Sequence, residues 1–153
     1  MNVEFSKEER IRRSAWLKER NKVPEFREKW FRSCKNRLRK LHQKLRYEMN
    51  LDELGFISEQ QILRYFVDEL NEEKKVIVEI YGDHPHANPV KYGPDYLVRL
   101  IGQSYTASEK WEMDEIRKQR LESAGYKVFV IWESDDLHLK KEQLRAILHS
   151  KIE

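Results

Sequence analysis

The chain has very little cysteine and no long run of apolar residues. Cys34 is its only cysteine, which excludes an internal disulfide framework and any cysteine-rich zinc site. No stretch approaches the roughly 18 consecutive apolar residues of a membrane-spanning helix. Residues 1–10 also lack the apolar stretch of a secretory signal. We therefore expect a cytoplasmic protein that does not use a membrane as a partner.

The chain is 153 residues long, 37% charged and 39% hydrophobic, and contains six Phe, seven Tyr and four Trp. So many aromatic side chains favour a folded protein over a disordered one. The length fits one domain of roughly 100–150 residues with a short extension.

The net charge of +3 is unevenly distributed along the chain. Residues 1–50 hold 16 Lys and Arg against seven Asp and Glu, whereas residues 51–153 hold 14 against 20. The first part therefore carries +9 and the second −6. This asymmetry fits either a solvated helical surface or a segment that binds a polyanion, because clustered cations neutralise phosphates and release counterions.

Two helices are expected in the basic part. Ser6 and Glu9 form a capping box for a helix that reaches about residue 21, and Pro24 suits the first turn of a second helix that reaches about residue 50. Apolar residues in the second helix recur at three- and four-residue steps, which predicts one stripe facing a core. The stripe comprises Phe26, Trp30, Cys34, Leu38, Leu41, Leu45 and Met49. The cations around it are the predicted phosphate contacts: Lys29, Arg32, Lys35, Arg37, Arg39, Lys40, Lys44 and Arg46.

Residues 51–153 alternate between strand-like and helix-like patterns, which predicts an α/β arrangement. Two antiparallel strands are expected, joined by a polar loop, and a loop rich in Gly and Pro follows them. Thr106 and Glu109 cap a later helix that ends at Gly125, with Trp111, Ile116, Leu121 and Ala124 facing inward. The expected strands are residues 62–68, 76–81, 96–101 and 126–132, and the last helix is 137–149.

Two acidic residues on the paired strands are candidate metal ligands. Asp68 and Glu79 lie near the strand ends, where their carboxylates can converge on a hard cation such as Mg²⁺. Glu79 interrupts an apolar strand, and a buried carboxylate is costly without a cation or a donor. The alternative is a glutamate at the strand edge that faces solvent.

The loop that follows carries further candidate residues. Asp83, His84, His86 and Asn88 gather within a few positions of Glu79. A histidine titrates near neutral pH and suits proton transfer beside a metal-bound water. A zinc site at His84 and His86 is the alternative, but the cysteines that would complete a structural site are missing.

These residues belong to a longer series of motifs between about residues 50 and 136. The series resembles the very-short-patch-repair (Vsr)-like endonucleases, in particular the phage homing endonuclease branch with the EDxHD site. The motifs, in order, are Leu54-Gly55-Phe56-x-Ser58-Glu59-Gln60, Val67-Asp68, Val78-Glu79-x-x-Gly82-Asp83-x-x-His86-Ala87-Asn88-Pro89, Thr106-Ala107-x-Glu109-Lys110-Trp111-x-x-Asp114-x-x-Arg117 and Leu121-x-x-x-Gly125-Tyr126-x-Val128-x-x-Ile131-Trp132-Glu133.

The resemblance implies a role for individual residues. Asp68 matches the strand aspartate that binds Mg²⁺, Glu79 lies near the second metal-facing position, and His86 matches the loop histidine. Glu59 would be the leading glutamate, although more distant members place theirs on a preceding helix. Asp114 would be the closing acidic residue, with an aspartate on a helix surface as the alternative.

The resemblance also implies the fold. We expect a restriction-endonuclease-like (PD-(D/E)xK-type) mixed sheet flanked by helices over residues 51–153, with residues 1–50 as a basic helical DNA-binding extension. Two departures weigh against a mismatch-repair enzyme. Pro85 stands where family loops often have an aromatic residue, and Cys34 alone cannot build the zinc site of the repair members.

The hypothesis from the sequence is a Mg²⁺-dependent DNA endonuclease of the phage homing or nicking type, with Mn²⁺ expected to substitute for Mg²⁺. Asp68 and Glu79 would hold the metal, His86 would activate water, and Asp83 and Asn88 would orient the loop or add ligands. The partner would be double-stranded DNA, the chain a monomer or a homodimer, and the compartment the host cytoplasm if a phage encodes it. A repair nickase and a catalytically degenerate nucleic-acid-binding protein are the alternatives.

Overall fold

The computed structural model describes residues 22–100 and 103–150, together with residues 8, 12, 15, 16 and 19. For residues 26, 27, 30, 31 and 34 it describes the backbone alone. The chain divides into two compact units, residues 1–37 and 38–153. The helix expected over residues 6–21 lies largely outside the described residues. None of the described helices is long and apolar enough to cross a membrane.

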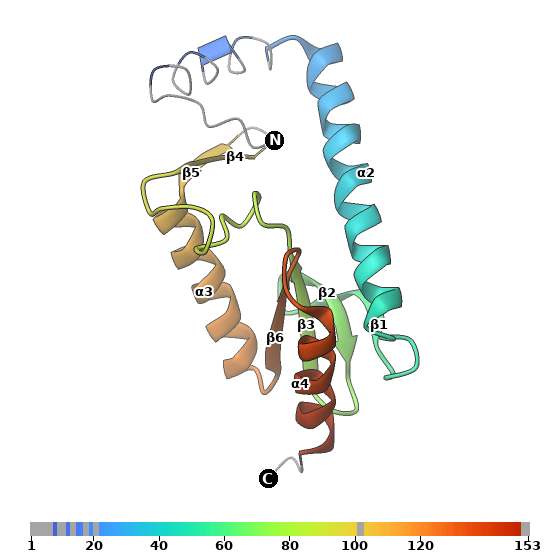
Figure 1. Cartoon of the computed structure of the whole chain (residues 1–153). Helices are drawn as coiled ribbons and strands as arrows, with labels where there is room; N and C mark the ends of the chain where they lie inside the picture. The colour runs from blue at the N-terminus through green and yellow to red at the C-terminus, as the bar shows by residue number, and fades with distance from the viewer. Residues whose placement is uncertain are drawn as a thin grey trace. The chain divides into compact units, whose positions relative to one another are not determined.

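Helix α2 runs from Pro24 to Glu48, close to the range expected from the sequence (Figure 1). Its last turns belong to the second unit, because Leu45 and Met49 are buried in the core of that unit. The second unit therefore begins inside α2. Asn50 adopts a positive φ of 54°, the left-handed conformation that commonly follows the end of a helix.

The apolar stripe of α2 is buried over only part of its length. Leu41 packs against the core beside Leu45 and Met49, as predicted, whereas Leu38 is 45% exposed. Leu38 lies one turn before Leu41, where the core of the second unit no longer covers the helix. The side chains of Phe26, Trp30 and Cys34 lie outside the described part of the chain, so the burial expected of them remains a prediction.

A mixed sheet of four strands forms the centre of the second unit. Its order is β1-β2-β3-β6, in which β1 pairs with β2 and β2 with β3 in antiparallel fashion, whereas β3 and β6 are parallel. The strands are β1 (Ile57–Ile62), β2 (Tyr65–Asn71), β3 (Val76–Tyr81) and β6 (Lys127–Trp132). Every residue of β3 is buried, as expected of a central strand with helices on both faces. The protein is therefore a mixed α/β protein.

The first hairpin differs from the sequence prediction. The strand expected over residues 62–68 begins instead at Tyr65, and β1 before it was not expected at all. The polar pair Gln60-Gln61 on an edge strand concealed β1, and the turn between the strands contains no glycine. Leu63 makes that turn with a φ of 55°, a conformation for which β-turns usually use Gly or Asn.

The remaining elements follow the capping signals closely. Helix α3 (Ala107–Ser123) begins at a complete capping box between Thr106 and Glu109, and helix α4 (Leu137–His149) begins at an N-cap Asp136. A separate hairpin of β4 (Leu97–Leu100) and β5 (Gln103–Thr106) precedes α3. Of this hairpin, only β4 was expected.

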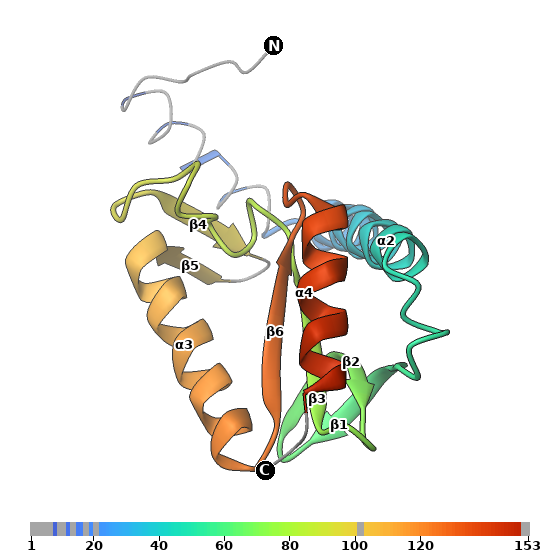
Figure 2. The same cartoon turned by 60° about the horizontal axis from the view of Figure 1, so that its bottom comes forward.

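The helices cover opposite faces of the sheet. Figure 2 shows α3 on one side of β6 and α4 on the other. Leu121 of α3 packs against Ile77 and Val128 on the first face. On the second face, Leu144 of α4 and Leu45 of α2 share a core with Ile131. Two apolar layers therefore hold the sheet between helices.

The inward face of α3 is more polar than the sequence predicted. Leu121 is fully buried and Trp111 packs against a small core, as expected, but Ile116 is 42% exposed and Ala124 is also exposed. The positions that turn inward carry Lys110, Asp114 and Arg117 instead, which lie at helical spacing with Leu121. Their partners are charged groups of the strands and of the following loop.

A buried glutamate joins α2 to the first hairpin. Glu69 of β2 is fully buried and accepts hydrogen bonds from Ser58 Oγ at 2.6 Å and from Arg46 of α2, and it is bonded to His42 Nε2 at 2.8 Å. Burial alone would raise the pKa of Glu69, but these partners outweigh it and lower the pKa. Arg46 also bonds Asp52 and the carbonyl of Phe56.

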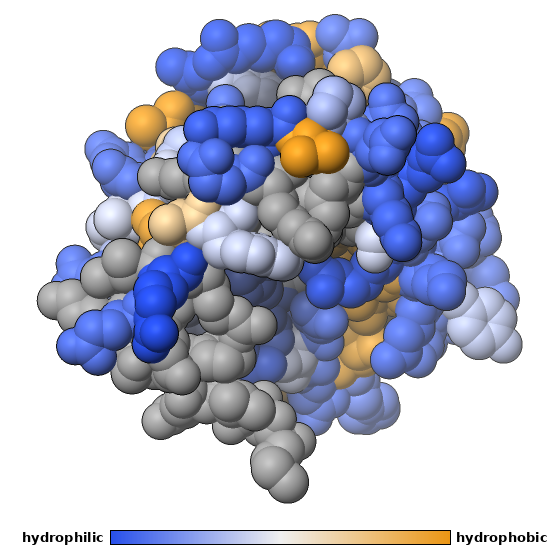
Figure 3. All heavy atoms as spheres, turned by 90° about the horizontal axis from the view of Figure 1, so that it is seen from above, coloured by the Kyte–Doolittle hydropathy of each residue, from blue (hydrophilic) through white to orange (hydrophobic). Residues whose placement is uncertain are grey.

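The molecular surface drawn in Figure 3 is mainly hydrophilic. On the face drawn in Figure 3, apolar side chains appear singly or in small groups among charged ones. Isolated exposed apolar residues of this kind are normal in folded proteins.

We predict that Arg46→Met destabilises the protein by about 2–3 kcal/mol, because it leaves the buried Glu69 carboxylate with one charged partner fewer. Urea unfolding followed by circular dichroism measures the loss. The matched control is Lys44→Met on the exposed side of the same helix, with an expected change of at most about 0.5 kcal/mol. Equal losses in the two variants would show that Arg46 contributes nothing through Glu69.

Candidate functional site

Asp68 and Glu79 meet between the two central antiparallel strands. The last backbone pair of β2 and β3 on this side is Glu69 with Val78, so Asp68 and Glu79 stand opposite each other one position further on. There the backbone N–H of Ile80 donates to Asp68 Oδ2 at 2.7 Å. The carboxylate of Asp68 thus replaces a backbone acceptor, which holds it beside Glu79.

Glu79 is 3% exposed, and its neighbours explain how a carboxylate is tolerated there. Burial raises the pKa of Glu79 to about 7, the charge of Asp68 adds to the rise, and Arg117 opposes it. Arg117 of α3 donates to Glu79 Oε1 through Nη2 at 2.7 Å and through Nε at 3.2 Å. The solvent-facing alternative for Glu79 is therefore wrong.

His86 and Asp114 form a second pair beside β3. The ring nitrogen Nδ1 of His86 lies 2.8 Å from Asp114 Oδ2, and Lys110 donates to the other oxygen of Asp114. The ring of His86 stacks on Tyr81, the last residue of β3, with centroids 3.9 Å apart and planes 2° apart. Burial disfavours ionised Asp114, but His86 and Lys110 outweigh it and lower its pKa. Asp114 is therefore not a free surface residue.

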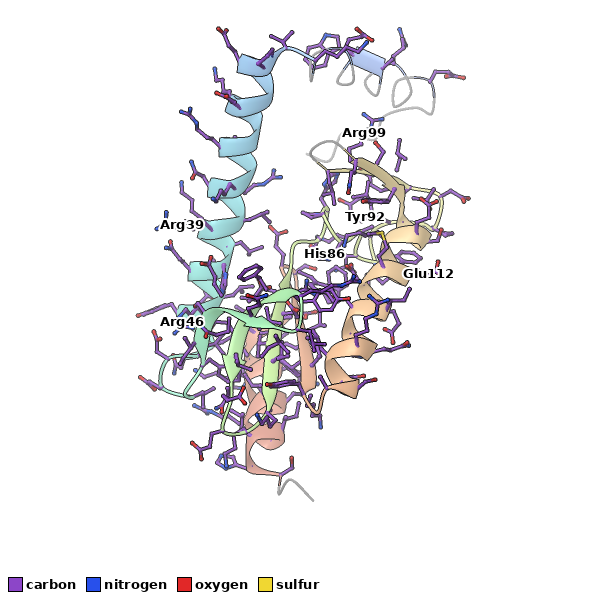
Figure 4. All side chains as sticks on the ribbon, turned by 180° about the vertical axis from the view of Figure 1, so that it is seen from behind. Arg39, Arg46, His86, Tyr92, Arg99 and Glu112 are labelled. Carbon is purple, nitrogen blue, oxygen red and sulfur yellow. The ribbon has the colours of Figure 1, made fainter. Side chains whose placement is uncertain are left out.

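The loop after β3 is built to present His86, which is labelled in Figure 4. Asp83 is buried and accepts hydrogen bonds from Asn88 Nδ2 at 2.8 Å, Ser134 Oγ at 3.1 Å and Lys91 Nζ at 2.6 Å. A Cβ on Gly82 would lie 3.1 Å from Pro85 Cδ, so the loop closes tightly on itself. The side chains of Asp83 and Asn88 hold the loop to the segment after β6.

Glu59 and His84 have other surroundings. Glu59 of β1 stands opposite Asp68 of β2, but it has a positive φ of 54° and an exposed side chain. Its charge contributes to the raised pKa of His42. His84 lies edge-on to Tyr92 and Tyr96, with centroids 6.1 and 6.0 Å away. Among the described contacts, Glu59 makes none with Asp68 or Glu79.

The oxygen donors around Glu79 suit a hard cation. Arg117 Nη2 donates to Glu79 Oε1 at 2.7 Å and to the carbonyl oxygen of Phe66 at 2.6 Å, so these two oxygens lie close together, and the carboxylate of Asp68 lies next to that of Glu79. Carboxylate and carbonyl oxygens are the ligands of Mg²⁺ and Mn²⁺. Within the described part of the chain, however, no three His, Cys, Asp or Glu side chains are gathered as a metal-binding group.

The two charged partners on α3 were missed as site residues by sequence reasoning. Arg117 appeared only as a motif position without a role, and Lys110 likewise. A usable signal was present: Lys110, Asp114, Arg117 and Leu121 recur at four-, three- and four-residue steps, where an amphipathic helix normally places apolar residues. Charged residues at such positions indicate partners inside the fold.

The basic side chains of α2 divide into two groups. Seven of the eight predicted phosphate contacts are exposed, namely Lys29, Arg32, Lys35, Arg37, Arg39, Lys40 and Lys44. Figure 4 shows Arg39 pointing away from the helix. Arg46 is instead bonded to Glu69 and Asp52, so its guanidinium supports the fold.

Comparison of the chain with protein-family models, curated proteins and solved structures found no match.

We predict that Glu79 makes the stability of the protein fall as the pH rises from about 4.5 to about 7. In this range the folded state keeps a proton on Glu79 that the unfolded chain releases, so the free energy of unfolding decreases with pH. Between pH 5 and pH 8, the free energy of unfolding of Glu79→Gln should rise by on the order of 2 kcal/mol relative to that of the wild type. Urea unfolding in EDTA measures it, with exposed Glu53→Gln as the control. Parallel pH curves for wild type and Glu79→Gln would contradict the assignment.

Proposed function

We propose that this protein is a metal-dependent DNA endonuclease, of the homing or nicking type that the sequence resemblance implies. The observation that carries the proposal is the pairing of buried Glu79 with Asp68 beside the His86–Asp114 pair. Two carboxylates in one place repel each other and a DNA phosphate alike unless a cation joins them. The fold gives both of them fixed positions instead of separating them, which favours a site that accepts a cation.

The fold supports the same proposal. A restriction-endonuclease-like fold implies a mixed sheet flanked by helices, and β1-β2-β3-β6 between α3 and α4 agrees with that expectation. The acidic pair lies on the two central strands β2 and β3, where their backbone ladder ends. Side chains there are held by a rigid scaffold at the point where the two strands separate.

Asp68 and Glu79 are the residues that would hold Mg²⁺ or Mn²⁺. The metal would supply positive charge next to the scissile phosphate and to the oxygen that leaves. The protein's own contribution is to place hard oxygen ligands around that position. Phe66 can add its carbonyl oxygen to the two carboxylates.

His86 is suited to act as the base that takes a proton from the attacking water. When Nδ1–H donates to Asp114, the neutral ring carries its lone pair on Nε2, which is the tautomer that accepts a proton. The ionised state of Asp114 also stabilises the imidazolium that forms. Tyr81 fixes the plane of the ring by stacking, so the direction of Nε2 is set before substrate arrives.

The exposed cations of α2 are the proposed contacts to the phosphates of double-stranded DNA. Of these exposed cations, Lys44 pairs with Glu48, 4.0 Å away, and none of the others has an ion pair with another residue that the structure describes. Contacts of this kind position the duplex and carry no sequence information. Base recognition would need other residues.

We predict that Asp68→Asn abolishes the nicking of supercoiled plasmid in Mg²⁺. Asparagine keeps an oxygen for the N–H of Ile80 and so preserves the strand contact, but it removes the charge that holds the metal. The matched control is Glu115→Gln on the exposed side of α3, which should cut normally. Undiminished cleavage by Asp68→Asn would contradict the catalytic assignment. A wild type that binds DNA but cuts neither matched nor mispaired duplexes would favour the degenerate binding protein.

We predict that replacing Lys35, Arg39 and Lys40 by Gln weakens DNA binding and makes its salt dependence shallower. Each phosphate that the variant no longer neutralises should reduce the slope of log K against log salt by about 0.9. Fluorescence anisotropy with a labelled duplex at several salt concentrations measures both effects. The control replaces the exposed residues Lys74, Lys127 and Arg145 by Gln, which removes the same amount of charge elsewhere on the protein. Equal slopes for the two triple variants would remove α2 from the interface.

A further inference from the structure

Arg117 occupies the position that a cation would take between β2 and β3. Its Nη2 atom lies 2.7 Å from Glu79 Oε1 and 2.6 Å from the carbonyl oxygen of Phe66. One nitrogen therefore bridges two of the oxygens that the proposed metal site would use. The charge of Asp68, the third oxygen donor, also stabilises the guanidinium.

The position of Arg117 leaves it within reach of a substrate. The side chain is 28% exposed, while the Glu79 side chain that it covers is only 4% exposed. Its guanidinium carbon lies 5.1 Å from the ring centroid of Tyr65, which supports the cation from one side. The guanidinium thus sits between a buried carboxylate and solvent.

The neighbouring arginine of the same helix behaves differently. Arg120 donates to Tyr65 Oη at 2.8 Å, and its side chain is exposed. Tyr65 is thus in contact with two cations of α3, of which only Arg117 is bonded to the carboxylate. This difference makes Arg120 a matched control for Arg117.

We propose that Arg117 exchanges between Glu79 and the scissile phosphate, so that DNA binding opens the metal site. This inference rests on the proposed nuclease function and adds the way in which substrate controls the site. A guanidinium matches the two oxygens of a phosphate as well as those of a carboxylate. When a phosphate takes over its hydrogen bonds, the oxygens of Glu79 and Phe66 become available to a divalent ion.

Two consequences follow from the competition between cations. Without DNA, a metal must displace Arg117, so the free protein binds it weakly. With DNA, the metal and the phosphate favour each other's binding by the same factor, because such coupling is reciprocal. The arrangement would keep the free protein from collecting metal in a site that has no substrate.

The experiment measures Mn²⁺ binding to the full-length protein without DNA, by isothermal titration calorimetry. Arg117→Met should bind Mn²⁺ at least about 10-fold more tightly than the wild type, because the competing cation is gone. Arg120→Met should bind it as the wild type does. Adding Asp68→Asn to Arg117→Met should remove the gain. Circular dichroism confirms that each variant is folded, and Arg117→Gln replaces Arg117→Met if the latter is not. Wild-type or weaker affinity in the folded Arg117 variant would overturn the exchange.

A second measurement separates this inference from the proposed function. In saturating Mn²⁺, the folded Arg117 variant should nick plasmid at least about 10-fold more slowly than the wild type, although it binds the metal more tightly. The reason is that the scissile phosphate no longer has the Arg117 guanidinium as a partner. Nicking at the wild-type rate would overturn the role of Arg117 at the phosphate. A wild type that nicks DNA, combined with an Arg117 variant of unchanged Mn²⁺ affinity, would refute the exchange and leave the nuclease standing. If the wild type never nicks DNA but the Arg117 variant binds Mn²⁺ more tightly, the proposed nuclease activity alone would be refuted.

Discussion

The arrangement of the site depends on one costly feature, a carboxylate in the middle of a buried strand. Glu79 lies between Val78 and Ile80, and every residue of β3 is buried. An unpaired charge in such surroundings would destabilise the fold severely. The fold compensates by raising the pKa of Glu79 and by bringing Arg117 of α3 onto its oxygen. The position of α3 on this face of the sheet is therefore tied to that carboxylate.

The same helix then organises the rest of the site. Asp114 lies one turn before Arg117 and bonds His86, and Lys110 lies one turn earlier and bonds Asp114. Positive and negative groups thus alternate along the inward face of α3, where an ordinary helix would bury apolar side chains. The loop after β3 is held separately through Asp83 and Ser134. His86 is consequently fixed from the strand, the helix and the loop together.

Much of the architecture could be predicted because it follows from local rules. The capping box at Thr106 and Glu109 placed the start of α3, and the apolar runs placed β3 and β6. The edge strands β1 and β5 were missed because they are short and polar, and because Leu63 turns the first hairpin without glycine. The acidic pair was also predicted, since an isolated carboxylate in an apolar strand requires a partner.

The amino-acid sequence by itself determined which segments are helices and central strands, and which residues are candidates for chemistry. The tertiary structure decided which of these candidates meet. It joined Arg117 to Glu79 across 38 positions of the chain and His86 to Asp114 across 28. It also committed Arg46 to Glu69 and left Glu59 with an exposed side chain. Periodicity and capping act over a few residues, whereas these contacts depend on the register of β2 with β3 and on how α3 packs against the sheet, which no short pattern encodes.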